Sequence, residues 1–466
     1  MMFPRLIIKT IDVVKNCLLQ RVFGEEEWSI DIAHDAIESI SPFVVVSRGK
    51  RVLLTSWASD ADNTLYDYVA LTKKKPTRTS FYANEIEILS WIKHPLYCEE
   101  SPEAIADSWE NKFCYRKETP QQPGLRQPQL AATHAFLANE TEKQRKIIVM
   151  PTGTGKTETM LSILIATQCQ KLLILVPSDV LRGQLYEKFV TLGVLPKFGV
   201  VPSDIKRPYV AKVTGSLEYD KWYEVIQKSN VVVTSMTLLA NCSPDVLNMM
   251  KASFSNVFVD EAHHSEAVTW DNVISGFVPH KVTLFTATPF RNDGKRIAGK
   301  FIYTFSLKEA QEQGYYKRIN YCPVREYDPK LADKVIAEKA IDILKRDRDN
   351  GHNHILMACC ATIKRANEVF KYYEDYQECS PVVVSSKTLG QKKIVEEIKR
   401  KEHKIIVCVN MLGEGFDLPE MKIAAIHDTR QSIPVTLQFV GRFTRVASRD
   451  ALLGRQVLWP TLPMFR

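Results

Sequence analysis

The sequence lacks the long apolar runs of membrane proteins, since no stretch approaches the roughly 20 apolar residues that a transmembrane helix needs. It also lacks a CxxC pair among its ten cysteines, which excludes the common zinc and redox motifs. The adjacent Cys359 and Cys360 suit neither a disulfide nor a zinc site. We therefore expect reduced thiols in a cytoplasmic protein that has no signal peptide and no membrane partner.

Charge of one sign and sequence repeats are also scarce. The 62 basic and 54 acidic residues leave a formal net charge of only +8, which permits a nucleic-acid partner without arguing for one. The sequence contains no low-complexity tract and no repeat of the solenoid type. Its 466 residues, 45% of them apolar, are enough for two or three ordinary globular domains.

The clearest pattern is a glycine-rich turn that follows a short apolar run. Residues 146–150 have the character of a buried parallel strand, and residues 151–157 read PTGTGKT before a helix-like run begins. Such glycines let backbone N–H groups converge on an anion, to which the helix N-terminus adds partial positive charge. Lys156 is predicted to reach terminal phosphates and Thr157 to ligate Mg²⁺. The first glycine of GxxxxGK[ST] is missing, because Met150 stands there.

A second apolar run, residues 256–259, ends in the adjacent carboxylates Asp260 and Glu261. Phosphoryl transfer to water needs an anion that holds Mg²⁺ and a base that orients the attacking water, and these two side chains fit those roles in that order. The alternative is a pair of surface acids that cap the next helix. His263 and His264 are adjacent, rarely converge on one ion in that arrangement, and are interpreted as structural or coupling residues.

Residues 1–120 carry no motif with an evident chemistry. Runs at 43–46 and 51–54 predict a β-hairpin, and the spacing of apolar residues over 83–93 predicts an amphipathic helix. Residues 73–82 mix lysine, arginine and aromatic side chains. They could hold a nucleic-acid backbone and a stacked base, although a solvated basic loop is the favoured interpretation.

Beyond residue 120, short β-rich runs alternate with helical stretches, which predicts parallel sheets covered on both faces. The strands of a first series are expected at 172–176, 231–234, 256–260 and 281–286. Those of a second series, which starts near residue 319, are expected at 354–357, 382–384, 404–409 and 423–426. The predicted domains are an N-terminal accessory region (1–120) and two α/β domains (121–305 and 306–466).

These motifs, in this order, resemble those of the superfamily 2 helicases, in the DEAH-box-like branch that includes the motor subunits of type III restriction enzymes. The resemblance covers about residues 125–449. It implies an α/β fold with two tandem RecA-like parallel-sheet domains, preceded by a small α+β N-terminal region. Residues 121–305 would be the helicase ATP-binding domain and residues 306–466 the helicase C-terminal domain, possibly truncated. Members of this branch often lack the first glycine of the phosphate loop, so Met150 is compatible with it.

The resemblance implies roles for residues of the first domain. Arg126 and Gln129 match the motif that reads the adenine base. The phosphate loop would comprise Thr152, Gly153, Thr154, Gly155, Lys156 and Thr157. Asp260 would hold Mg²⁺ together with the Thr157 hydroxyl, and Glu261 would activate the attacking water.

Other segments match further motifs of the branch. Those expected to contact the nucleic-acid backbone are 176–184 and 234–235, and 286–294 matches the motif that couples hydrolysis to movement. In the second domain, residues 355–360 resemble the strand that begins this lobe. Gly415 and Asp417 lie in the motif at the nucleotide-facing edge.

Arg442 and Arg445 match the arginine motif of the branch. Arginines three apart on a helix share a face, and a guanidinium against the γ-phosphate stabilises charge in the transition state. Taken alone, such a pair is more often a solvated helix face. Because both lie in the second domain, the site would be complete only when the domains close on ATP.

We therefore expect an ATP hydrolase that uses ATP and Mg²⁺ as a helicase or translocase, on DNA rather than RNA. One alternative is an ATP-gated clamp that binds nucleic acid without unwinding it. Another is the motor subunit of a restriction, defence or repair complex, with a nuclease on a different polypeptide. We find no nuclease signature outside the ATP site.

The C-terminal residues 454–466 show little pattern, whereas members of this branch generally continue with another strand of the second sheet. In a shifted reading frame, codons for residues 458–465 can encode Val-Ala-Asn-x-x-Asp-Val. We expect that a frameshift ends this reading frame early; the alternative is that codon degeneracy produces the match.

Overall fold

The computed structural model describes residues 2–32, 35–57, 65–262, 273–289, 297–316, 319–385, 391–409, 418, 420–428 and 455–460. The chain divides into two compact units. The first comprises Met1–Leu125, Thr157–Val176 and Arg182–Phe258, and the second comprises Arg126–Lys156, Pro177–Leu181 and Val259–Arg466.

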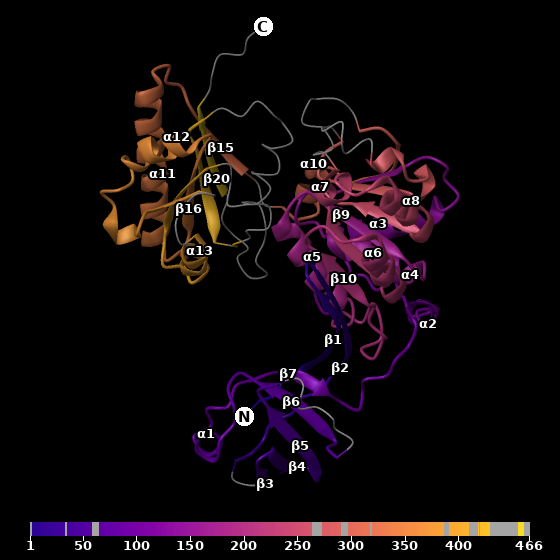
Figure 1. Cartoon of the computed structure of the whole chain (residues 1–466). Coiled ribbons are helices and arrows are strands. Elements are labelled where there is room, and N and C mark those ends of the chain that lie inside the picture. Colours follow the sequence, from indigo (N-terminus) through magenta and orange to yellow (C-terminus); the bar gives the residue numbers. More distant parts are fainter. Residues whose placement is uncertain are drawn as a thin grey trace. The chain divides into compact units, whose positions relative to one another are not determined.

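A five-stranded sheet built from the N-terminal residues lies in the first unit (Figure 1). Its order is β3 (Ala36–Ile40), β4 (Phe43–Ser47), β5 (Lys50–Thr55), β6 (Tyr68–Thr72) and β7 (Ile88–Lys93). The short helix α1 (Arg78–Tyr82) packs the fully buried Phe81 into its core, which also contains Trp28 and Trp91. The predicted hairpin is confirmed, since β4 and β5 pair antiparallel.

The helix predicted over 83–93 is wrong, because residues 88–93 form β7, which pairs antiparallel with β6. Ile88 and Trp91 are three residues apart, as on one face of a helix, and register shifts in the pairing of β7 with β6 allow both to reach the same core. Packing of Trp91 against the aromatic core selects the strand, since strand preference depends on the neighbours that a side chain meets.

The first unit also contains strands of a larger, mostly parallel sheet. Their order is β1 (Leu6–Val14), β2 (Cys17–Glu25), β10 (Val210–Val213), β11 (Val231–Ser235), β9 (Leu172–Val176) and β12 (Asn256–Val259). All residues of β9 and β11 are buried, as expected for parallel strands covered on both faces. The associated helices are α2 (Pro102–Asp107), α4 (Lys156–Ala166), α5 (Asp179–Thr191), α6 (Tyr219–Lys228), α7 (Met236–Ala240) and α8 (Pro244–Ser253).

The hairpin β1–β2 joins this sheet through antiparallel pairing of β2 with β10. Two ion pairs with a buried arginine reinforce the junction: Arg21 lies 3.0 Å from Glu100, and Arg207 lies 3.1 Å from Glu25. The start of the chain is thereby part of the same sheet as the strands of the predicted ATP-binding domain.

The second unit contains three parallel strands in the order β13 (Val282–Thr286), β8 (Lys146–Val149) and β14 (Lys300–Thr304). Helices α3 (Gln127–Ala138) and α10 (Leu307–Glu312) belong to this part of the chain. Strand β8 is buried throughout and leads into the glycine-rich turn.

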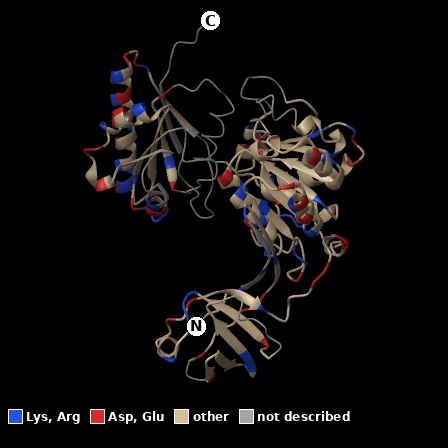
Figure 2. Ribbon diagram, viewed as in Figure 1, with Lys and Arg blue, Asp and Glu red and all other residues tan. Residues whose placement is uncertain are grey.

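A six-stranded sheet of parallel pairs lies further along the second unit. Its order is β15 (Ile319–Val324), β20 (Arg455–Pro460), β19 (Met421–Ile426), β16 (Ile355–Cys360), β18 (Ile405–Val409) and β17 (Val382–Val384). Its helices are α11 (Pro329–Asp349), α12 (Ile363–Phe370) and α13 (Gln391–Lys399). Lysine, arginine and acidic side chains alternate along α11 (Figure 2).

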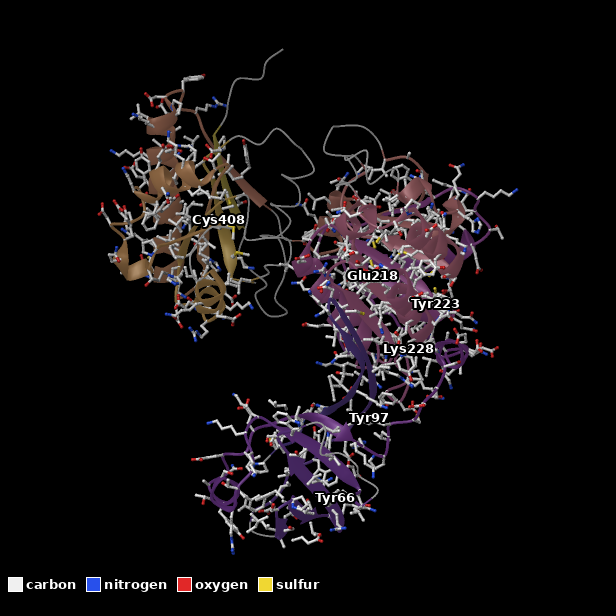
Figure 3. All side chains as sticks on the ribbon, viewed as in Figure 1. Tyr66, Tyr97, Glu218, Tyr223, Lys228 and Cys408 are labelled. Atoms are coloured by element: carbon white, nitrogen blue, oxygen red, sulfur yellow. The ribbon has the colours of Figure 1, made fainter. Side chains whose placement is uncertain are left out.

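Strand β20 comes from the C-terminal stretch that showed little pattern. It pairs parallel with both β15 and β19, so backbone hydrogen bonds to two neighbours define it rather than any periodicity of its sequence. Residues 455–460 therefore contribute a strand to the second sheet, and the frameshift stays a prediction. All ten cysteines are free thiols, including the buried Cys408 labelled in Figure 3. No helix of the described residues is both long and apolar enough to span a membrane.

A buried charge network joins the helices of the second sheet to its carboxyl edge. Asp333 of α11 accepts a hydrogen bond from Arg365 of α12 (3.0 Å) and from His427 Nδ1 (2.9 Å). The other ring nitrogen, Nε2, lies 2.9 Å from the Tyr373 hydroxyl. Arg365 also donates to Asp428, at 3.0 Å. The network therefore connects the end of β19 to the helices α11 and α12.

Hydrogen bonding determines the ionisation of this network. Burial alone would raise the pKa of Asp333, but hydrogen bonds from His427 and Arg365 outweigh burial and lower this pKa. Burial lowers the pKa of His427 in spite of the neighbouring Asp333 carboxylate. The pair is therefore an ionised aspartate beside a neutral histidine at neutral pH.

We predict that Asp333→Asn lowers the free energy of unfolding by about 3 kcal/mol, because it leaves the buried His427 without its carboxylate and removes one of the two carboxylates, Asp333 and Asp428, that Arg365 contacts. Urea unfolding of wild type and variant measures this. The control is Glu368→Gln, whose half-exposed carboxylate lies 3.4 Å from the same arginine and should contribute less than about 0.5 kcal/mol. Equal effects of the two substitutions would contradict the prediction.

We further predict that His427 makes stability fall as the pH drops below about 6.5, the ordinary histidine value. The pKa of His427 is lowered in the folded state, so the unfolded chain binds the proton more tightly and gains population in acid. His427→Gln should flatten this loss between pH 7.5 and pH 5.5. His280→Gln, at an exposed position, should show the same dependence of unfolding free energy on pH as the wild type. The same dependence in all three proteins would rule the idea out.

Candidate functional site

The glycine-rich turn forms the loop that its sequence predicts. Gly153 and Gly155 have φ values of +86° and +98°, in the region that glycine adopts without steric cost. A Cβ atom at Gly155 would lie 1.8 Å from Nε2 of the Gln129 side chain, so space as well as conformation requires glycine there. Helix α4 starts at Lys156, directly after the loop.

Lys156 meets both predicted carboxylates at the end of this loop. Its Nζ donates to Glu261 Oε1 at 2.6 Å and lies 3.9 Å from Asp260 Oδ1. The three side chains are buried, with relative exposures of 8%, 7% and 5% for Lys156, Glu261 and Asp260. Their charges are largely removed from water, so each depends on the others for stabilisation.

Glu261 has a strained backbone. Its φ of +50° is unusual for a residue with a side chain and costs about 1–3 kcal/mol. The Glu261 N–H donates to Asp260 Oδ1 at 3.0 Å, which holds the two carboxylates at a fixed relative position. Such strain is retained where the surrounding structure requires a particular side-chain direction.

Arg126 and Gln129 lie beside the loop. The Arg126 guanidinium donates to the Gly153 carbonyl at 2.9 Å, and the Arg126 N–H donates to Gln129 Oε1 at 2.7 Å. The buried Gln129 side chain covers Gly155, as noted above. The structure therefore places the two residues matched to the base-reading motif next to the phosphate loop.

The hydroxyl groups of the loop differ in their partners. Thr154 Oγ1 donates to the Pro151 carbonyl at 2.7 Å, which closes the turn. The Thr152 hydroxyl is buried and makes no hydrogen bond within the described residues. Thr157 is the second residue of α4. A buried hydroxyl without a partner is costly in an empty site and suits one that receives a polar ligand.

Two residues of this region were missed by the sequence analysis. The Tyr316 hydroxyl donates to the Thr152 carbonyl, and the Tyr315 ring lies 5.4 Å from the Arg126 guanidinium. Both follow α10, in a stretch with no motif. The only signal was a pair of adjacent tyrosines after a glycine, which is too common to single out.

Several predicted residues lie outside the described ranges. These are Gly415, Asp417, Arg442 and Arg445, together with His263, His264 and residues 290–294. Within the described part of the chain, no group of three or more histidine, cysteine, aspartate or glutamate side chains could hold a metal ion by itself.

The basic and aromatic segment 73–82 presents fewer free groups than its sequence indicates. Phe81 is fully buried, so only Tyr82, 55% exposed, offers an aromatic surface. Lys73 is paired with Glu87 at 2.7 Å.

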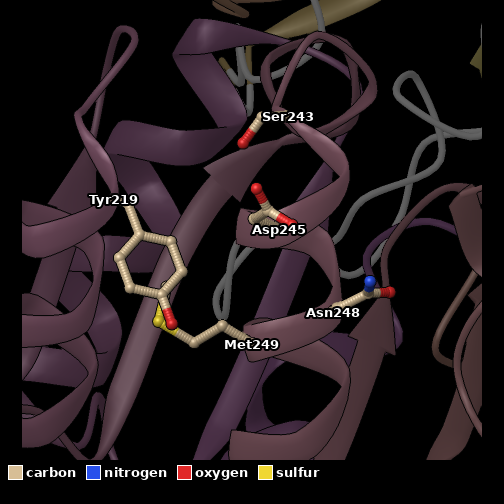
Figure 4. Close-up of a pocket in the computed structure, with 5 residues that line it drawn as sticks. All are labelled: Tyr219, Ser243, Asp245, Asn248 and Met249. Atoms are coloured by element: carbon tan, nitrogen blue, oxygen red, sulfur yellow. The ribbon is translucent and has the colours of Figure 1, made fainter.

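A pocket separate from the glycine-rich loop lies in the first unit (Figure 4). It has a volume of about 490 Å³, and its lining residues come from α6 and the start of α8: Tyr219, Ser243, Asp245, Asn248 and Met249. None of the residues predicted for nucleotide binding lines it.

Two protein families match the chain in tandem. The family described as "Type III restriction enzyme, res subunit" matches residues 122–291, and the "Helicase conserved C-terminal domain" matches residues 336–447. The first of these matches contains Lys156, Asp260 and Glu261.

Individual relatives are distant and match in part. "Putative helicase 22" of Sulfolobus islandicus filamentous virus is 23% identical over 231 residues, which cover 41% of this chain and 40% of the viral protein. UvrABC system protein B of Escherichia coli is 24% identical over 147 residues, which cover 30% of this chain and 22% of that protein. The similarity thus spans less than half of either relative.

Among solved structures, the DNA-bound ATP-dependent Type ISP restriction-modification enzyme LlaBIII has a TM-score of 0.51 at 16% identity. The match covers 92% of this chain and 35% of that one, and at this identity it bears on the fold alone. The fold is α/β, with two tandem RecA-like parallel-sheet domains after a β-rich N-terminal region. With both family domains in order, the chain belongs to the superfamily 2 helicases of the restriction type.

Proposed function

We propose that this chain is an ATP-driven nucleic-acid motor, a helicase or translocase, and that it hydrolyses ATP at the cluster of Lys156, Asp260 and Glu261. The observation that carries the proposal is the 2.6 Å contact between Lys156 and Glu261 at the end of the glycine loop. A lysine that binds a terminal phosphate and a carboxylate that activates water have to act on the same phosphorus atom, and these two side chains lie within reach of one.

The residues divide the work as follows. Lys156 binds the β- and γ-phosphates, and backbone N–H groups of the loop bind the remaining phosphate oxygens. Glu261 orients the attacking water and accepts its proton. Arg126 and Gln129 contact the adenine base.

Magnesium suits the donor atoms of this site. Asp260 and Thr157 supply a carboxylate and a hydroxyl, the hard oxygen ligands that Mg²⁺ prefers. When bound, Mg²⁺ would neutralise part of the phosphate charge. No metal-ligating histidine or cysteine is required.

The second domain completes the site in this proposal. Arg442 and Arg445 would stabilise charge on the γ-phosphate, and Gly415 and Asp417 would face the nucleotide. Bound ATP would then favour closure of the two domains proposed at 121–305 and 306–466, and hydrolysis of ATP would allow the domains to open again. Each cycle of closure and opening would move the protein along its track.

DNA is the proposed track, and a multi-subunit defence or repair complex is the proposed setting. The family that matches residues 122–291 takes its description from the res subunit of type III restriction enzymes, and restriction enzymes act on DNA. A partner that carries the nuclease would account for the absence of a nuclease signature in this sequence.

We predict that ATP turnover is stimulated by single-stranded or duplex DNA more than by RNA, and that Lys156→Ala and Glu261→Gln each lower it by at least about 100-fold. Steady-state phosphate release measures the rates. A matched control is Glu224→Gln with Lys228→Ala, because this pair on α6 has the same 2.6 Å separation but is exposed (Lys228 is labelled in Figure 3). Nucleotide binding without stimulated turnover would favour the clamp instead.

We also predict that Glu261→Gln tightens ATP binding while it abolishes turnover. Glu261 accepts a hydrogen bond from Lys156, so a nucleotide has to displace a buried, charge-assisted hydrogen bond. Removal of the carboxylate charge should lower the Kd for ATP by roughly threefold to tenfold. Competition against a fluorescent ATP analogue measures this, and an unchanged or higher Kd would show that the ion pair does not oppose nucleotide binding.

A further inference from the structure

Tyr315 supports the corner of the site that carries Arg126. Its ring centroid lies 5.4 Å from the Arg126 guanidinium carbon, within the range of a cation–π contact. Its hydroxyl accepts a hydrogen bond from the Gln127 N–H at 3.2 Å. Gln127 is the first residue of α3, where backbone N–H groups have no partner inside the helix. Tyr315 therefore caps this helix from outside and holds its preceding arginine.

Phe305 holds the Tyr315 ring from another direction. The two rings meet edge to face, with centroids 6.2 Å apart, and Phe305 directly follows β14. Tyr315 is thus anchored to a strand of the sheet and not only to the residues that it supports.

Tyr316 supports the phosphate loop. Its side chain is buried, and its hydroxyl donates to the Thr152 carbonyl, while Arg126 donates to the next carbonyl, that of Gly153. The C=O and the N–H of one peptide unit point in opposite directions. With the Thr152 carbonyl held by Tyr316, the Gly153 N–H of the same peptide unit points away from that carbonyl, whereas the Thr154 N–H donates to the Pro151 carbonyl at 3.2 Å. Within the described residues, the Gly153 N–H makes no hydrogen bond to protein, so it is available to an anion.

The two tyrosines are adjacent in a segment that joins two sheets. They follow α10, and β15, the first strand of the six-stranded sheet, begins three residues later at Ile319. One dipeptide therefore contacts the base-reading corner through one ring and the phosphate loop through the other.

We propose that Tyr315 and Tyr316 are positioning residues of the nucleotide site, with separate duties. Tyr315 positions Arg126 and the start of α3 for the adenine base, and Tyr316 directs the Gly153 N–H toward the phosphates. The inference rests on the proposed nucleotide site at residues 151–157. It assigns to the connecting segment a part in nucleotide recognition that no motif of this sequence indicates.

The two roles predict different effects of substitution on the Kd for different ligands. Loss of the Tyr315 ring leaves the hydrogen bond from Arg126 to the Gly153 carbonyl in place and weakens the interaction with the base, so the effect depends on which base the nucleotide carries. Loss of the Tyr316 hydroxyl weakens the interaction with the phosphates, so the effect is the same for every triphosphate. A residue that served only packing would change all affinities through stability and would not distinguish the two.

The test measures the Kd of the full chain for ATP, CTP and inorganic tripolyphosphate, by competition against a fluorescent ATP analogue. For Tyr315→Ala we expect the Kd for ATP to rise on the order of tenfold, with changes below about twofold for CTP and tripolyphosphate. Tyr315→Phe, which keeps the ring, should retain most of the preference for ATP. For Tyr316→Phe we expect a rise of roughly threefold to tenfold that is equal for the three ligands.

Tyr327→Ala is the control, because this tyrosine of the same unit is 79% exposed and should change no affinity. Thermal melting of each variant establishes that it is folded. If the wild-type chain binds none of the three ligands, the nucleotide site itself is wrong and this proposal fails with it. If the wild type binds them but Tyr315→Ala weakens all three equally, or Tyr316→Phe weakens none, only the positioning roles are overturned.

Discussion

The buried ion pair between Lys156 and Glu261 is the interaction on which the rest of the site depends. A lysine and two carboxylates removed from water are stable only together, so the loop before Lys156 and the strand before Asp260 have to end at the same place. Parallel strands meet this requirement, because their carboxyl ends share one edge of a sheet. The positive φ of Glu261 is the conformational cost of directing that side chain toward the lysine.

The same ion pair would compete with a bound phosphate for Lys156. In the proposed function, a nucleotide has to replace one set of charged contacts around Lys156 with another, so binding energy is exchanged rather than simply added. The supports of the loop, by contrast, are contacts of neutral or guanidinium donors to carbonyl groups, from Arg126 and Tyr316. They can persist when phosphate arrives on the opposite side of the peptide units. The site thus combines a charge pair that has to rearrange with a frame that does not.

Sequence patterns predicted the elements that repeat a simple physical rule. Buried parallel strands appear as short apolar runs, and those at 172–176, 231–235 and 355–360 lie where they were expected. The sequence patterns gave a wrong prediction at 83–93, where apolar spacing indicates a helix. There, packing of Trp91 against its aromatic neighbours favours a strand. The patterns also failed at β20, which is defined by the strands beside it.

The sequence by itself determined the order of the domains and the identity of the chemical groups, since the glycine loop, Lys156 and the two carboxylates are local patterns with specific chemistry. Only the tertiary structure decided which groups meet. Lys156 and Glu261 are 105 residues apart, and Tyr315 and Tyr316 are more than 160 residues from the loop that they support. Such contacts depend on the packing of distant elements, and a tyrosine that donates to a backbone carbonyl requires nothing of the residue beyond its carbonyl group, so the sequence contains no sign of the partnership.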